Sequence, residues 1–67
     1  MKNWPWTVHY RGREGKEVRR QERNKAVAMR AACDLMEVGI NVHAITGPKG
    51  MTVERDEIER LCRKAKR

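Results

Sequence analysis

The sequence predicts a small α+β domain in which an antiparallel β-sheet is covered on one face by two helices, in the order ββαββα. Two stretches support this layout, VHYRGREGKEVRR at residues 8–20 and VHAITGPKGMTVER at 42–55. Each places Gly-x-x-Gly between two extended segments, as a β-hairpin does, and each is followed by apolar residues at helical spacing. With 67 residues, the chain is expected to form one domain, 1–67, with a frayed basic tail at 63–67.

The first hairpin is expected to begin with a half-buried strand at residues 6–11, where apolar and polar residues alternate. Residues 12–15 form its turn, and Gly15 can adopt the positive φ that closes a short hairpin. The return strand at 16–21 has only Val18 as a firmly apolar residue, which indicates an edge strand protected by its charges. The residues expected on the inner face of the first strand are Trp6, Val8 and Tyr10.

A helix is predicted over residues 25–38, with Asn24 as its N-cap and Gly39 at its end. One face of this helix carries mostly small apolar residues, which would allow a close approach to the sheet. Those residues are Ala28, Ala31, Ala32, Leu35 and Met36. The opposite, polar face carries Arg30, Asp34 and Glu37.

The second hairpin is predicted from a strand at residues 40–46, a turn at 47–50 and a short return strand at 51–53. Pro48 sets the first corner of the turn, and Gly50 supplies a positive φ. Simple alternation places three residues of the first strand on one face, namely Ile40, Val42 and Ala44.

The last helix is expected to start near Glu54 as N-cap, with Val53 and Ile58 forming a hydrophobic staple across its first turn. Acidic residues come first and basic residues last, as the helix dipole favours. The predicted apolar face follows the i, i+3, i+4, i+7 rule through Ile58, Leu61, Cys62 and Ala65.

Composition limits the size of the core, because only 39% of the residues are hydrophobic and none is Phe. Burial in such a short chain gives marginal stability, so the sequence leaves open a homodimer that adds buried surface. We expect no membrane-spanning segment, since no apolar run approaches eighteen residues. The start of the chain also lacks the apolar region of a secretory signal, and a cytoplasmic, reduced protein is the simplest interpretation.

The cysteines and histidines do not predict a metal or catalytic site. Cys33, Cys62, His9 and His43 show none of the short paired spacings of structural zinc sites. We expect both cysteines to be buried free thiols next to apolar helix faces, with no disulfide between them. The sequence contains no Ser and no evident pairing of a nucleophile with a base, so we expect neither an enzyme nor a bound cofactor.

Charge is the strongest functional signal in the sequence. The net charge is +7, and it divides into +6 over residues 1–30, −4 over 31–59 and +5 over 60–67. Two basic regions that flank an acidic middle favour a polyanionic partner. The predicted nucleic-acid-binding residues are Arg11, Arg13, Lys16, Arg19, Arg20, Arg23, Lys25, Arg63, Lys64, Lys66 and Arg67.

The stretch WTVHYRGREGKEVRRQERNKAVAMRAA, residues 6–32, resembles the arm-type DNA-binding domain at the N-terminus of many phage integrases. That family has a Trp-containing strand, a Gly-Lys turn, a basic return strand and an Ala-rich helix, and its sheet docks on DNA. The likeness lies within residues 4–32. The sequence departs from that family in two ways. Only two strands are predicted before the helix, where the family has three, and the aromatic residue that precedes the helix in the family is absent. The matching residues are Trp6, Gly15, Lys16, Arg19, Arg20 and Ala28.

Together these features predict a small nucleic-acid-binding accessory protein, with DNA favoured over RNA. The first hairpin and the C-terminal tail would contact phosphates, and hydrogen-bonding side chains on the outer sheet face would be available to bases. Those side chains are Thr7, His9, Arg11, Arg19, Asn41 and His43. The alternative is a protein-interaction module that binds an acidic protein surface, with Trp4 as its apolar anchor and Trp6 in the core.

Overall fold

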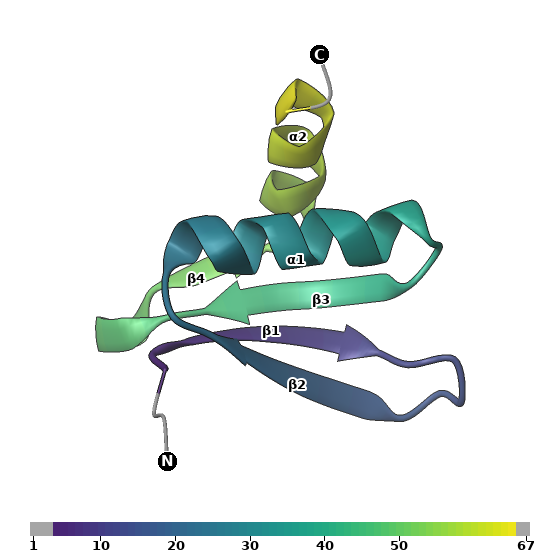
Figure 1. The fold of residues 1–67 in the computed structure, drawn as a ribbon, viewed down its shortest axis with the longest axis horizontal. Coiled ribbons are helices and arrows are strands. Elements are labelled where there is room, and N and C mark those ends of the chain that lie inside the picture. Colours follow the sequence, from purple (N-terminus) through teal and green to yellow (C-terminus); the bar gives the residue numbers. More distant parts are fainter. Residues whose placement is uncertain (1–3, 66–67) are drawn as a thin grey trace.

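The computed structural model of the chain describes residues 4–65 and confirms the ββαββα order (Figure 1). All four strands belong to one antiparallel sheet with the strand order β2-β1-β3-β4. The elements are β1 (Trp6–Arg11), β2 (Glu17–Glu22), α1 (Lys25–Glu37), β3 (Asn41–Thr46), a single 3-10 turn η1 (Pro48–Gly50), β4 (Thr52–Glu54) and α2 (Arg55–Ala65).

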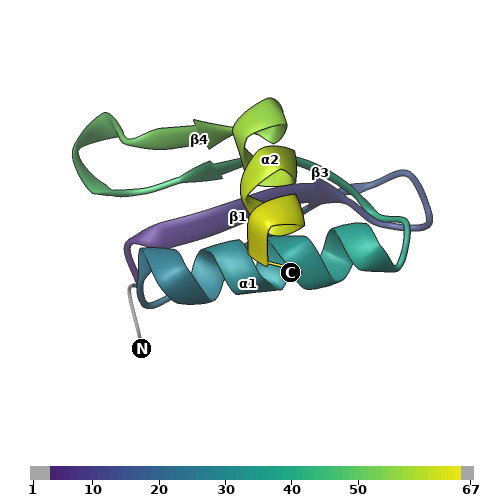
Figure 2. The same cartoon turned by 90° about the horizontal axis from the view of Figure 1, so that it is seen from above.

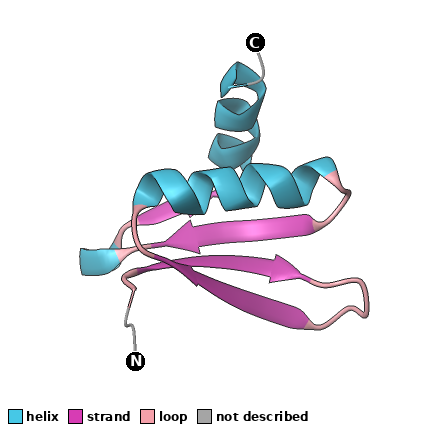
Figure 3. Cartoon of the chain, in the orientation of Figure 1, coloured by secondary structure: helices cyan, strands magenta, loops and turns pink. Residues whose placement is uncertain are grey.

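Both helices pack on the same side of the sheet. Helix α1 lies along the strands and contacts β1, β2 and β3, while α2 rises steeply from the end of β4 and contacts α1, β3 and β4 (Figures 1 and 2). No helix within residues 4–65 covers the opposite face, so the described chain forms two layers with one open sheet face (Figure 3).

The core lies between the central strands and the small-residue face of α1. Trp6 and Val8 point inward from β1, as alternation predicts, and three alanines of α1 meet them. Because alanine side chains are short, the helix backbone can lie close to the sheet. The buried core residues are Trp6, Val8, Ala28, Ala31, Ala32, Val42, Ile45, Val53 and Ile58.

The ends of α1 confirm the signals read from the sequence. Asn24 Oδ1 accepts a hydrogen bond from the Val27 backbone N–H at 2.9 Å, as an N-cap does. At the other end Gly39 has a φ of 85°, and the Ile40 N–H donates to the Leu35 carbonyl at 3.0 Å. The helix ends at Glu37, one residue earlier than predicted.

The predicted alternation of β3 is wrong at Ala44. A register irregularity opposite the His9–Tyr10 step lets Val42 pair with Tyr10 and Ile45 pair with Val8. The extra residue in β3 shifts the alternation, so Ile45 is fully buried and Ala44 is only partly buried. A bulge of this kind cannot be found by alternation alone, because it breaks the two-residue period.

Both hairpin turns lie where the sequence predicts them. The Gly12 N–H donates to the Lys16 carbonyl at 2.8 Å, and Gly15 has a φ of 81°. In the second turn Gly50 has a φ of 76°, and Lys49 also has a positive φ, of 59°, which the sequence did not indicate. The structure confirms β2 as an edge strand; β4 forms the other edge.

The apolar face predicted for α2 is only partly buried. Ile58 is fully buried, whereas Leu61 keeps 37% of its surface exposed because α2 rises away from the sheet after its first turn. Arg63 and Lys64 lie in the last turn of this helix, and Lys66 and Arg67 of the predicted tail lie outside the described residues. Within residues 4–65, neither helix has the length and apolar character that crossing a membrane requires.

The bulge in β3 predicts different costs for neighbouring substitutions. Ile45→Ala removes a fully buried side chain and should lower the free energy of unfolding by about 2–5 kcal/mol. Ala44→Ser changes a partly buried residue on the other face and should cost no more than about 0.5 kcal/mol. Urea denaturation followed by circular dichroism measures both values. Equal costs would contradict the bulged register.

Gly47 packs directly under the indole ring of Trp6. A Cβ at position 47 would lie 2.5 Å from Trp6 Cζ3, whereas a Cβ at Gly12 would lie 3.5 Å from its nearest neighbour, Val18 Cγ2. We therefore expect Gly47→Ala to lower the free energy of unfolding by about 1–3 kcal/mol through overpacking. Gly12→Ala is the matched control and should lose much less in the same urea titration. A harmless Gly47→Ala would show that the Trp6 ring is not held in this position.

Candidate nucleic-acid interface

The open face of the sheet is polar. Strand pairing places Thr7 opposite Thr46, and His9 opposite Arg19. Arg11 lies between its two cross-strand partners, Glu17 on β2 and Asn41 on β3. These residues alternate with the buried ones along the strands, so their side chains project away from α1. The polar residues of this face are Thr7, His9, Arg11, Glu17, Arg19, Gln21, Asn41, His43, Thr46, Thr52 and Glu54.

His9 links the three neighbouring strands of the open face. A hydrogen bond of 2.9 Å joins its Nε2 atom to Thr46 Oγ1 on β3. Its Nδ1 atom lies 4.0 Å from Glu17 Oε2 on β2. The imidazole is thereby held between the two strands that flank β1, and the ring is only partly exposed. His43 stands beside the bulge of β3 and is exposed.

Four of the predicted cationic residues lie together on or next to this face. Arg11 and Arg19 project from β1 and β2, and both are exposed. Arg13 and Lys16 are exposed in the β1–β2 turn, at the opposite end of the sheet from η1 (Figure 1). We call these four residues the hairpin cations. Residues 11–19 carry four bases and two acids, so this end of the open face has a net positive charge.

Arg20 does not belong to this surface. It pairs with the buried Val8, so its side chain lies on the helix-bearing side of the sheet. Its Nε atom lies 2.6 Å from Glu22 Oε2, and only 8% of the Glu22 side chain is exposed. The contact is a close ion pair, but Oε2 has no well-directed hydrogen bond. We therefore assign Arg20 to the compensation of a buried carboxylate.

The other predicted binding residues within residues 4–65 are spread over the molecule. Arg23 lies in the β2–α1 connection and Lys25 is the first residue of α1. Arg63 and Lys64 are exposed at the end of α2, on the helix side of the sheet. The nine of these cations that lie within residues 4–65 thus do not form one patch, because adjacent strand residues point to opposite faces and the two basic segments lie on different elements.

The two cysteines are bonded to each other, which the sequence analysis did not predict. Cys33 of α1 and Cys62 of α2 form a disulfide, with an S–S distance of 2.00 Å and a Cα–Cα distance of 5.5 Å. The expectation of free, buried thiols, which was based on their place beside apolar helix faces, is therefore wrong. The signal that could have revealed the pair is that each cysteine lies beside the apolar face of an amphipathic helix, and these faces meet. Within residues 4–65, no three His, Cys, Asp or Glu residues are grouped so that they could hold a metal ion.

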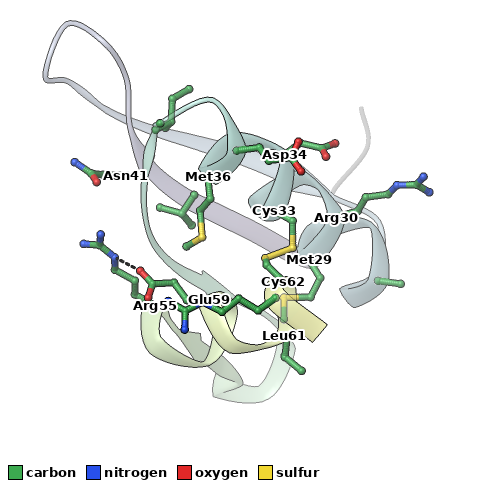
Figure 4. Close-up of a pocket in the computed structure, with 16 residues that line it drawn as sticks. Met29, Arg30, Cys33, Asp34, Met36, Asn41, Arg55, Glu59, Leu61 and Cys62 are labelled. Atoms are coloured by element: carbon green, nitrogen blue, oxygen red, sulfur yellow. Dashed lines mark hydrogen bonds and ion pairs between the residues drawn. A yellow bond between two sulfur atoms is a disulfide. The ribbon is translucent and has the colours of Figure 1, made fainter. Parts of the chain in front are cut away.

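The disulfide lines an open groove of about 790 Å³ between α1, α2 and the start of β3 (Figure 4). Met29, Met36 and Leu61 surround it, and the ion pair between Arg55 Nε and Glu59 Oε2, 3.1 Å long, lies at its rim. The groove is on the helix side of the molecule and is separate from the open sheet face.

Comparison of the chain with protein-family models, curated proteins and solved structures finds no match. The resemblance to the arm-type domains of phage integrases therefore rests on the residues that carry it. In the structure the third strand of the sheet follows α1, whereas that family completes its three strands before the helix.

The position of Arg20 predicts a structural role that its neighbour Arg19 does not share. Arg20→Ala leaves the Glu22 carboxylate buried without its cation and should lower the free energy of unfolding by about 1–3 kcal/mol. Arg19→Ala removes an exposed side chain from the open face and should change it by no more than about 0.5 kcal/mol. Thermal and urea unfolding of the two variants test this difference. Equal losses would mean that the Arg20–Glu22 contact adds nothing to the free energy of unfolding beyond what an exposed arginine contributes.

Proposed function

We propose that this protein binds nucleic acid through the open face of its sheet and the β1–β2 turn. The observation that carries the proposal is the grouping of the four hairpin cations beside a polar sheet face that no described helix covers. A flat layer of hydrogen-bonding side chains with exposed arginines suits a polymer that offers phosphates at its edge and bases within reach. The net charge of +7 would add a long-range attraction.

Arg11, Arg13, Lys16 and Arg19 would contact phosphates, since all four are exposed. The neighbouring Thr7, Asn41 and Gln21 would be available for hydrogen bonds to sugar or base edges. Glu17 lies among the hairpin cations and Glu54 lies on β4, so the positive charge of the hairpin end comes from the excess of four bases over two acids in residues 11–19. Duplex DNA is the preferred partner, because small β-sheets can dock in the grooves of DNA and arginine can read guanine in the major groove.

No catalytic step is part of this proposal, and no cofactor is needed for it. The cytoplasmic location expected from the sequence also stays a prediction. It would require the Cys33–Cys62 disulfide to persist, or to cycle, where thiols are normally kept reduced.

Binding to random-sequence duplex DNA should depend steeply on salt. Four phosphate contacts give a slope of about −3.6 in log K against log salt, which is about a hundredfold loss of affinity between 50 and 200 mM. Arg11→Ala and Arg19→Ala should each reduce the magnitude of the slope by about one unit. Fluorescence anisotropy with a labelled duplex measures these slopes.

Arg20→Ala is the matched control, because it removes the same charge from the neighbouring position on the other face. It should leave the salt slope unchanged under conditions in which the variant remains folded. Equal effects of Arg19→Ala and Arg20→Ala would indicate attraction by overall charge and would overturn the assigned surface. An absence of binding at 50 mM salt would leave the acidic protein surface as the partner to examine.

A further inference from the structure

We propose that the Cys33–Cys62 disulfide is a reversible thiol–disulfide exchange site that clamps the second half of α2 and releases it on reduction by a dithiol. The disulfide links two helices that follow different hairpins, 29 residues apart in the chain. This proposal does not depend on nucleic-acid binding, because it concerns the helix side of the molecule.

The first argument is accessibility. Both cysteines are only partly buried, and both line the open groove between α1 and α2 (Figure 4). Disulfides that only stabilise a fold are usually shielded from attacking thiols, while exposed ones are the ones that exchange. Met29 and Leu61 line the same groove and make its lining partly apolar. A small dithiol, or the active-site loop of a dithiol reductase, could reach the sulfurs from this side.

The second argument is the way α2 is attached. Its first half is fixed by the chain leaving β4 and by Ile58, which is fully buried. Its second half contains Leu61, which is 37% exposed, and the exposed Arg63 and Lys64. The ion pair between Arg55 and Glu59 lies within α2 and does not tie it to another element. The disulfide is therefore the covalent link that holds the second half of α2 against α1.

The third argument is that the core does not include the disulfide. The fully buried residues Val8, Val42, Ile45 and Ile58 lie between the sheet and the helices, and Cys62 only packs against the edge of this cluster. Breaking the S–S bond should therefore loosen α2 after Ile58 while the sheet and α1 stay in place. Two states of one helix, clamped and released, are the elements that a redox switch requires.

The chemistry is a two-step exchange. A thiolate of the dithiol attacks the Sγ of one cysteine, the S–S bond breaks, and the other cysteine leaves as a thiolate that takes up a proton. The second thiol of the reagent, as its thiolate, then attacks the mixed disulfide and releases the first cysteine. The dithiol is oxidised to a cyclic disulfide, and Cys33 and Cys62 are both reduced to thiols.

The test treats the oxidised protein with dithiothreitol under native conditions. Alkylation and mass spectrometry should show that both cysteines react without denaturant. Hydrogen exchange at residues 61–65 should accelerate by about tenfold or more, while residues of β1 and β3 change by less than about twofold. The Cys33→Ser/Cys62→Ser variant should show the fast exchange at once and should not respond to dithiothreitol.

Three outcomes would overturn the proposal. Resistance of the disulfide to dithiothreitol until urea unfolds the protein would identify a shielded bond. Unchanged exchange at residues 61–65 after reduction would show that other contacts hold α2. Loss of the sheet on reduction, seen by circular dichroism and by exchange throughout β1 and β3, would identify a structural staple of the whole domain.

Discussion

The structure depends on the close contact between the alanine face of α1 and the two central strands. Ala28, Ala31 and Ala32 are buried against β1 and β3, whose inward residues Val8 and Ile45 pair directly. A chain of 67 residues has few large apolar side chains, so it can fill only one thin layer. Close packing of small residues makes such a layer dense enough to hold a four-stranded sheet.

Because the core lies on only one side of the sheet, the side chains on the other face are in contact with solvent. That face is polar in every strand, and His9 joins its neighbours on both sides through Thr46 and Glu17. On the described part of this face the exposed cations gather at the hairpin end, whereas positions further along β1 and β2 carry the uncharged Thr7 and Gln21. The same constraint that limits the core therefore creates the surface for which we propose a ligand.

Local signals in the sequence predicted most of the fold. Asn24 and Gly39 bound α1, and Gly15 and Gly50 mark the turns, because each acts through its own backbone or its nearest neighbours. Tertiary features could not be predicted in this way. The bulge that buries Ile45 depends on pairing with β1, and the joining of Cys33 to Cys62 depends on the angle between two helices. The candidate site was predicted only in part, since strand alternation separates Arg19 from Arg20.

The separation of Arg19 from Arg20 also shows why a count of basic residues is a weak guide to a binding surface. The two arginines are adjacent, chemically identical and both exposed, yet one lies on the open face and the other is paired with a buried carboxylate on the opposite side of the sheet. The Arg20 guanidinium already compensates the charge of the Glu22 carboxylate. If Arg20 bound a phosphate instead, that buried carboxylate would lose its cation. A cation can serve a polyanion only where the fold has not already given it a partner, and on this sheet the register decides which arginines meet that condition.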